Sequence, residues 1–433
     1  MTLLATVGFI MVAVFMILIM TKRLHPVTAL ILVPFVVALG FGWGPQSGKW
    51  IVAGIKQVVP TSVMLCFAIL YFGILIDVGF FDPLVNRIVK FVKGDPAKLC
   101  VGTAILAAIV ALDGDGATTY MVTCTALYPL HKRMQIKPMI LPALCLMQVS
   151  IMNILPWGGP SGRVLIITET SVSQLFGALG PSMVVGLVWV CLVAYYWGLQ
   201  ERKRLGIMNV EGVDFSAHAG EDRKDRPVQS QYVQWLNLGL TLGLIVMLLK
   251  EVIPLSAMFM IAAALALIIN YPKVKDQSRI MSEIAPDCLN IVILTFAAGA
   301  FVGIMQGSKM IDSMAKAMVL AIPESLGSHL GFISSFLSIP GTYFLTNDAY
   351  YYGVLPIFLQ AAKVYSITPV AMGIAALIGQ GVHLLSPLVA STYLLVGLTK
   401  VDYGDFQKFT LIPCLSISIV MLIVAMIFGH ITF

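Results

Sequence analysis

The stretch Leu112-Asp-Gly-Asp-Gly-Ala-Thr-Thr119 interrupts what otherwise reads as membrane-depth sequence. It separates two apolar runs, 99–111 and 120–130, of about 11–13 residues each, whereas a helix needs ~20 residues to cross a bilayer. The two glycines interrupt a regular helix, and charge at membrane depth is expensive enough to mark a functional site. We therefore predict a re-entrant hairpin whose tip lies near the membrane midplane. The alternative is an exposed loop between two short helices.

The composition of the chain indicates a polytopic membrane protein. The 433 residues are 59% hydrophobic and 11% charged, with a mean hydropathy of +0.93, whereas soluble domains carry about 25% charged residues. The first apolar run ends in Thr21-Lys-Arg23 without a cleavage site of small residues, which indicates a spanning helix rather than a signal peptide. The seven cysteines form no CxxC pair and are expected to be small core residues. The net charge of +6 is expected to set the membrane topology, and no nucleic-acid partner is expected.

Ten apolar runs are long enough to span a membrane, and shorter runs fill the gaps between them. The ten runs are 3–20, 24–43, 58–79, 138–170, 178–199, 234–250, 254–271, 286–306, 366–399 and 407–431. The shorter runs predict re-entrant hairpins at about 97–131 and 328–363, and the spans 138–170 and 366–399 contain breaks. The predicted fold is an all-α polytopic membrane protein with ten spanning helices, two hairpins and helices broken at the midplane.

The basic residues predict the orientation of these spans. With the loops assigned alternately from an external N-terminus, twenty of the 27 Lys and Arg residues fall on one side and six on the other, while Arg163 lies within a span. The positive-inside rule then places both termini outside and the polar segment 201–232 in the cytoplasm. The expected location is the plasma membrane, which in a bacterium is the inner membrane.

Two copies of one pattern divide the chain. A Gly and an Asp lie nine residues apart in 72–84 and again in 302–314, and the copies are 230 residues apart. Later segments pair in the same order, 113–119 with 345–349 and 153–163 with 379–387. We predict two inverted repeats, 1–200 and 233–433, each with five spans and one hairpin, joined by the cytoplasmic linker 201–232. Inverted repeats with broken helices are typical of secondary transporters, whose site lies where the breaks meet.

The first hairpin tip offers oxygen ligands. Asp113 and Asp115 lie two residues apart, and Thr118 and Thr119 follow with hydroxyl groups that we expect to contact substrate. Carboxylate, hydroxyl and freed carbonyl oxygens suit a hard cation such as Mg²⁺ or Ca²⁺. They suit proton binding equally, since a buried carboxyl takes up a proton more readily than an exposed one. Both roles stay open for the two aspartates.

The first broken helix contains Asn153-Ile-Leu-Pro-Trp-Gly-Gly-Pro-Ser-Gly-Arg163, which cannot form a continuous helix. A half-helix begins after the break, and its free backbone amides favour an anion. We predict substrate contacts from Asn153, Gly158, Gly159 and Ser161. Arg163 is predicted to hold a substrate carboxylate bidentately. The alternative for Arg163 is an internal pair with Glu169 or with one of the site aspartates.

Polar residues mark the corresponding positions of the second half. The tip of the second hairpin ends in Thr346-Asn347-Asp348, whose oxygens are expected to contact substrate and metal. The segment 350–352, three consecutive tyrosines, is expected to supply interfacial or packing aromatics.

The second broken helix contains Gly379-Gln-Gly-Val-His-Leu-Leu-Ser-Pro387. His383 occupies the repeat position of Asn153, and Ser386 follows three residues later. We predict that His383 carries protons or binds substrate and that Ser386 binds substrate.

These motifs resemble a known family. The runs 111–120, 155–160 and 344–356 read ALDGDGATTY, LPWGGP and FLTNDAYYYGVLP, and they are similar to those of the citrate–divalent metal/proton symporters, the CitMHS family. Dicarboxylate members of the wider ion transporter superfamily carry Ser-Asn-Thr at both tips and use sodium. This chain has Asp-Gly-Asp and Thr-Asn-Asp there instead, which fits a metal that arrives with the substrate. The resemblance also implies a homodimer whose transport domain moves like an elevator.

The residues and the resemblance together predict a secondary active transporter rather than an enzyme. The expected reaction is proton-coupled symport of citrate complexed with a divalent cation such as Mg²⁺ or Ca²⁺, with the cation as co-substrate and no permanently bound cofactor. The expected metal contacts are Asp113, Asp115, Asn347 and Asp348, and the expected proton carriers are Asp113, Asp115, Asp348 and His383. The alternatives are a proton- or sodium-coupled carrier of another free di- or tricarboxylate, an intramembrane enzyme and a channel. An enzyme lacks support, because no His-Glu-x-x-His or Gly-x-Ser-x-Gly motif occurs.

Overall fold

A computed structural model describes residues 3–21, 23–92, 94–114, 116–207, 230–250, 253–321 and 324–432. Every regular element in these ranges is a helix, which confirms the predicted all-α fold. The first half contains α1 (Leu3–Met20), α2 (Pro26–Gly40), α3 (Gly44–Asp77), α4 (Asp82–Val92), α5 (Pro96–Val110), η1 (Ala111–Asp113), α6 (Gly116–Arg133), α7 (Ile140–Met152), α8 (Gly159–Thr168) and α9 (Val172–Leu205).

The second half repeats much of this order of long and short helices. It contains α10 (Gln231–Lys250), α11 (Leu255–Asn270), α12 (Val274–Gly307), α13 (Met310–Ala321), α14 (Glu324–Gly327), α15 (Leu330–Phe344), η4 (Ala349–Val354), α16 (Leu355–Val364), α17 (Pro369–Ile378), α18 (Gln380–His383), α19 (Ala390–Thr399) and α20 (Tyr403–Ile427). α3 and α12 both contain 34 residues. The assignment of the two halves to inverted repeats stays a prediction.

The lengths of the helices fit a multi-pass membrane protein. Five described helical segments are long and apolar enough to cross a membrane, and they are α3, Pro96–Asp113, α9, α12 and α20. The shorter apolar helices include the half-helix that precedes each predicted break, because Pro and Gly end it early.

Several helices begin at residues whose side chains bind free backbone amides. Asp95 precedes α5 and its carboxylate accepts a hydrogen bond from Ala97 N at 3.0 Å. Ser171 and Gln174 form a capping box at the start of α9, and Thr368 Oγ1 accepts a hydrogen bond from Ala371 N at 3.1 Å at the start of α17. Such caps satisfy amides that the helix itself leaves without partners. They fix where α5, α9 and α17 enter the bundle.

Two helices are longer than the apolar runs 58–79 and 286–306 predict. α3 begins at Gly44 and α12 at Val274, so Lys49 and Lys56 lie inside α3 rather than in a loop. Hydropathy detects only the part of a helix that is apolar, and a helix continues through charged turns as long as its backbone bonds and packing persist. Both helices therefore extend well beyond their apolar parts.

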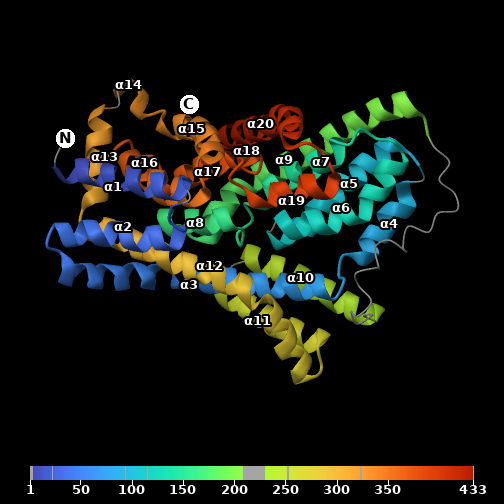
Figure 1. Cartoon of the computed structure of the whole chain (residues 1–433), viewed down its shortest axis with the longest axis horizontal. Helices are drawn as coiled ribbons and strands as arrows, with labels where there is room; N and C mark the ends of the chain where they lie inside the picture. Colours follow the sequence, from blue (N-terminus) through green and yellow to red (C-terminus); the bar gives the residue numbers. More distant parts are fainter. Residues whose placement is uncertain are drawn as a thin grey trace.

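The helices form two groups, which can be followed in Figure 1. α2, α3, α10, α11 and α12 lie along the lower side of the view, and α5–α9 with α15–α20 lie along the upper side. The closest association in the lower group is between α3 and α12, with α2 and α11 beside them. From the upper group, η1 and α8 contact α3, and η4 contacts α12. Both predicted hairpin tips and the first break thus face the long helices.

Glycines allow α3 and α12 to cross closely. A Cβ atom on Gly54 would lie 2.0 Å from the carbonyl oxygen of Gly299, and one on Gly303 would lie 2.1 Å from the carbonyl oxygen of Trp50. Gly299 and Gly303 form the GxxxG spacing that lets membrane helices approach backbone to backbone. The crossing is therefore a contact of main chain with main chain.

We expect Gly54→Ala to lower the stability of the protein. The added methyl group meets a backbone oxygen, so the helices must separate, at a cost of about 1–3 kcal/mol for an overpacked site. Thermal unfolding of the purified protein in detergent measures the effect. Gly48→Ala is the matched control, because a Cβ atom there meets nothing within 4 Å. Equal melting temperatures for the two variants would show that the close crossing does not stabilise the fold.

Candidate functional site

The first hairpin tip contacts the first break. Gly114 has a φ of 77°, a left-handed conformation that glycine adopts without strain. A Cβ atom on Gly114 would lie 3.4 Å from the Cα of Gly158, so the two turns meet glycine to glycine. The indole Nε1 of Trp157 donates a hydrogen bond to the carbonyl oxygen of Leu112 at 2.7 Å. Asp115, the second predicted acid of this tip, lies outside the described residues.

The first break is anchored to the lower group of helices by aromatic packing. Trp157 stacks on Phe72 of α3 with ring centroids 5.6 Å apart, and its edge meets Phe259 of α11 at 5.3 Å. Within the break, Ser161 Oγ donates to the carbonyl oxygen of Ile154 at 2.8 Å. Ser161 is fully buried and its predicted substrate contact stays a prediction. The tip, the break and the long helices are thus joined at Trp157.

Arg163 and Asp348 bring the two halves of the chain together. Arg163 Nε on α8 donates to Asp348 Oδ1 at the second hairpin tip at 2.7 Å. The two side chains are 12% and 11% exposed, so the pair is largely removed from water. The structure therefore shows the alternative expected for Arg163, an internal pair with a site aspartate. Glu169, the other candidate partner, binds Gln57 instead. The bond uses only Nε, and the outer edge of the guanidinium, with Nη1 and Nη2, is not part of it.

The second hairpin tip contacts the second break in an equivalent way. Thr342 Oγ1 donates to the carbonyl oxygen of Gly379 at 2.8 Å, and Ser418 Oγ of α20 donates to that of Ile378 at 2.8 Å. These hydroxyls donate hydrogen bonds to carbonyl oxygens that have no partner within the broken helix. His383 Nδ1 lies 2.6 Å from the carbonyl oxygen of Thr342. A carbonyl only accepts, so Nδ1 carries a proton, and Nε2 is the acceptor when the ring is neutral.

Asn347 is held by a residue that the sequence did not single out. Gln380 Nε2 donates to Asn347 Oδ1 at 2.8 Å and to the hydroxyl of Tyr351 at 2.8 Å. Tyr351 lies in η4, a π-helical turn of a kind often found at functional sites. The segment 350–352 is buried, so these tyrosines pack inside the protein rather than at the membrane interface.

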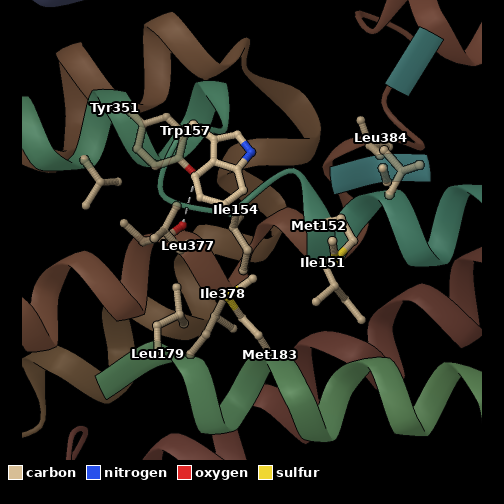
Figure 2. Packing of buried hydrophobic residues seen from close by; sticks show 14 of the residues in the cluster. Ile151, Met152, Ile154, Trp157, Leu179, Met183, Tyr351, Leu377, Ile378 and Leu384 are labelled. Atoms are coloured by element: carbon tan, nitrogen blue, oxygen red, sulfur yellow. Dashed lines mark hydrogen bonds between the residues drawn. The ribbon is translucent and has the colours of Figure 1, made fainter. Parts of the chain in front are cut away.

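The two breaks share one apolar cluster. Figure 2 shows Ile151, Met152 and Ile154 of the first broken helix in the same cluster as Leu377 and Ile378 of the second. Buried aliphatic side chains of this kind hold the two polar turns at a fixed separation, because interiors are close-packed. The contacts are long-range and come from both halves of the chain.

Two predicted residues of the second half bind the backbone beside them. Thr346 Oγ1 accepts a hydrogen bond from Ala349 N at 3.2 Å, and Ser386 Oγ accepts one from Leu388 N at 3.2 Å. In the first half, Asn153 ends α7 and Gly158 precedes α8, while Thr119 is fully buried in α6. The structure positions these residues at the turns, and their substrate contacts stay predictions.

A cavity of about 550 Å³ lies beside the first hairpin tip. Asp113 and Thr118 line it from the tip, and Asp287 and Asn290 line it from α12. Asp287 and Asn290 were not predicted, although an acid followed by an amide inside the apolar run 286–306 is the same signal that identified Asp113. The cavity therefore lies between the first hairpin tip and α12.

A second cavity of about 680 Å³ has Glu169 in its wall, together with Gln57 and Thr61 of α3. Glu169 ends α8 in a left-handed conformation with a φ of 55°. Its Oε1 accepts hydrogen bonds from Gln57 Nε2 at 2.9 Å and from Gln306 Nε2 of α12 at 3.3 Å. One carboxylate therefore joins the outer end of α8 to both long helices.

The structure brings Arg163 and Asp348 together, and it places Asp113 at a cavity beside the first tip. A guanidinium suits a carboxylate, and carboxylate oxygens suit a hard cation. Among the described residues, no group of three or more His, Cys, Asp or Glu side chains forms a metal cluster. The metal contacts expected of Asp113, Asp115, Asn347 and Asp348 therefore stay predictions.

Comparison with known proteins assigns the chain to a family. The model of the CitMHS citrate transporters matches residues 15–379. A citrate transporter of Bacillus subtilis (strain 168) is 47% identical over 430 residues, which cover 99% of this chain and all of that protein. A Mg²⁺/citrate complex secondary transporter of the same strain is 45% identical over 433 residues, covering 99% of both chains. The YdaH transporter of Alcanivorax borkumensis has a similar fold, with a TM-score of 0.60 at 14% identity over 88% of this chain and 87% of that one. The chain belongs to the CitMHS family of citrate transporters.

Proposed function

We propose that this transporter carries citrate as a complex with a divalent cation of the Mg²⁺ or Ca²⁺ type, together with protons. The observation that carries the proposal is the buried pair of Arg163 with Asp348, which joins a basic group of the first half to an acid of the second. A relative that is 45% identical is a transporter of the Mg²⁺/citrate complex, which supports the same class of substrate here.

Charge favours the complex over free citrate. Free citrate brings three negative charges, and the turns already hold Asp113, Asp115 and Asp348. A bound divalent cation offsets much of this repulsion, because like charges at short range are costly where water is scarce. In this proposal the aspartates face the cation, and Asp113, Asp115, Asp348 and His383 are the proton carriers. His383 suits proton transfer, since its Nε2 is left as an acceptor.

In the proposal the anion is held by groups that donate hydrogen bonds, namely a guanidinium, backbone amides and polar side chains. The outer edge of Arg163 has two N–H groups in the geometry that suits a carboxylate. At the start of α8 the amide of Gly159 faces the anion, while Gly158 N already donates to the carbonyl oxygen of Leu155 at 2.7 Å and Gly158 contributes the turn itself. Asn153, Ser161 and Ser386 add polar groups at the breaks. Thr118, Thr119, Thr346 and Asn347 complete the substrate contacts from the two hairpin tips.

The proposal includes the membrane arrangement. Residues 1–200 and 233–433 form two inverted repeats, with hairpins at about 97–131 and 328–363 and broken helices at 138–170 and 366–399. Both termini lie outside, the linker 201–232 lies in the cytoplasm, and the transporter is a homodimer that works by an elevator movement. Two contacts support the repeats, because α8 packs on η4 while α6 packs on α19, each joining one half to the other.

Uptake into proteoliposomes tests the function. Labelled citrate is supplied under an inward proton gradient with Mg²⁺, Ca²⁺, Zn²⁺ or EDTA, and protein-free liposomes are the control. We expect uptake only when both the gradient and a divalent cation are present. Uptake that persists in EDTA or follows a sodium gradient would replace this proposal with a free-anion carrier, and current without saturation would indicate a channel.

We expect Asp113→Asn to reduce metal-dependent citrate uptake by at least about tenfold, the effect of losing roughly 1.4 kcal/mol of binding. Asp113 lines the cavity at the first tip, and the amide lacks the charge that the cation requires. The control is Asp312→Asn, since Asp312 is 44% exposed and pairs with Lys309 on the surface. Wild-type uptake by Asp113→Asn, at equal amounts of protein in the membrane, would contradict the site.

A further inference from the structure

The backbone on each side of Gln380 packs closely against a neighbouring helix. A Cβ atom on Gly379 would lie 2.2 Å from the carbonyl oxygen of Ser338, and one on Gly381 would lie 2.4 Å from Ser418 Oγ. The segment therefore fits only with glycine on each side of Gln380, pressed between α15 and α20. The backbone fixes where the glutamine side chain begins.

The side-chain amide of Gln380 uses both of its N–H groups. Nε2 donates to Asn347 Oδ1 and to the hydroxyl of Tyr351, each at 2.8 Å. Tyr351 in turn donates to the carbonyl oxygen of Ala376 at 3.4 Å, so its oxygen remains the acceptor for Gln380. The two donors of the amide thus have fixed directions, one of them toward the second hairpin tip.

The other polar atom of the Gln380 side chain, Oε1, shows what the residue costs in stability. Gln380 is 1% exposed, and its Oε1 has no hydrogen-bond partner in the part of the chain that the structure describes. A buried oxygen of this kind costs about 1–3 kcal/mol. Packing alone would be served better by a methionine of the same length, which has no such oxygen. The amide is therefore explained by the two groups that its N–H donors bind, Asn347 Oδ1 and the Tyr351 hydroxyl.

We propose that Gln380 is a positioning residue that turns the Asn347 carboxamide so that its N–H₂ group meets the transported anion. The two polar atoms of an amide lie on opposite sides of its carbon, so binding Oδ1 to Gln380 directs Nδ2 elsewhere. An N–H₂ group donates to carboxylates and does not ligate cations. Of the two roles expected for Asn347, this assigns the anion and not the metal, and it rests on the proposed function.

The test is a double-mutant cycle read as KM and maximal rate. Gln380→Met, Asn347→Ala and the double variant are compared in proteoliposomes with labelled citrate and Mg²⁺. We expect Gln380→Met to raise KM about tenfold, equivalent to roughly 1.4 kcal/mol of binding, with a maximal rate within about twofold of wild type. The double variant should match Asn347→Ala, because Gln380 acts through that residue.

Two further variants separate positioning from packing. Gln380→Leu also removes both donors and buries no charge, so it should raise KM as Gln380→Met does even if the methionine folds poorly. Tyr351→Phe removes the other acceptor of Nε2 and leaves the bond to Asn347, so its KM should stay near wild type. The order of preference among Mg²⁺, Ca²⁺ and Zn²⁺ should be the same in every variant.

Three results would overturn the proposal. They are an unchanged KM in both Gln380 variants, KM effects that add in the double variant, and a changed order of cation preference. If wild-type protein carries another carboxylate and not citrate, the proposed substrate fails while the cycle still decides the role of Gln380 with the carboxylate that is carried. The two failures are therefore distinguishable.

Discussion

Arg163→Gln is expected to reduce citrate uptake by at least about a hundredfold. The change leaves the Asp348 carboxylate, 11% exposed, without its partner, and breaking a buried pair costs about 3–5 kcal/mol. It also removes the guanidinium edge proposed to hold a substrate carboxylate, and each 1.4 kcal/mol of lost binding is roughly a tenfold loss in affinity. Uptake of labelled citrate with Mg²⁺, at equal reconstituted protein, measures the loss.

The doubly neutral variant separates an internal pair from a substrate contact. Arg163→Gln with Asp348→Asn leaves no unpaired charge, so its melting temperature should return toward wild type while uptake stays low. Recovery of uptake in this variant would mean that the guanidinium serves only Asp348 and that Asp348 itself binds neither the cation nor a transported proton. Arg279→Gln is the control for the loss of a cation, because Arg279 pairs with Glu283 on an exposed helix surface.

Gly158→Ala is expected to abolish most uptake by distorting the first break. A Cβ atom on Gly158 would lie 1.9 Å from the carbonyl oxygen of Asn153, a backbone atom that cannot move without opening the turn. The turn carries Trp157, whose bond to Leu112 joins it to the first hairpin tip. We expect uptake to fall by about tenfold or more, as for a loss of at least roughly 1.4 kcal/mol.

Gly177→Ala is the matched control for this change, since a Cβ atom there, in α9, meets nothing within 4 Å. Both proteins are compared by uptake and by thermal unfolding in detergent. Normal uptake by Gly158→Ala would show that the break tolerates a different backbone path, and the proposed amide contacts at the start of α8 would then lose their support.

Local sequence signals located most of the turns that carry the candidate residues. Gly and Pro mark where a helix must end, so the turns near Asp113, Asn153 and His383 could be predicted from residue type alone. For Arg163 the structure shows the alternative, an internal pair with a site aspartate, and the predicted substrate contact stays a prediction. The sequence left Glu169 open as its partner, and only the fold decides, because Glu169 lies on the far end of α8 and binds Gln57 and Gln306 instead.

Other features depend on contacts between distant segments and could not be predicted. Gln380 matters because it meets Asn347, and nothing in the sequence near either residue indicates that meeting. The true lengths of α3 and α12 depend on their packing against each other, which hydropathy does not report. Asp287 differs from these features, because an acid within an apolar run is a signal that the local sequence does contain.

The bridge from Glu169 to Gln57 and Gln306 bears on how fast the protein can turn over. These are ordinary hydrogen bonds at an exposed carboxylate, each worth about 0.5–1.5 kcal/mol net. A contact of that size changes the balance between two access states by roughly tenfold, without becoming a barrier that slows every cycle. A buried ion pair in its place would trap one state. In the proposed elevator movement, this weak bridge would let the carrier rest in one orientation and still leave it within each transport event.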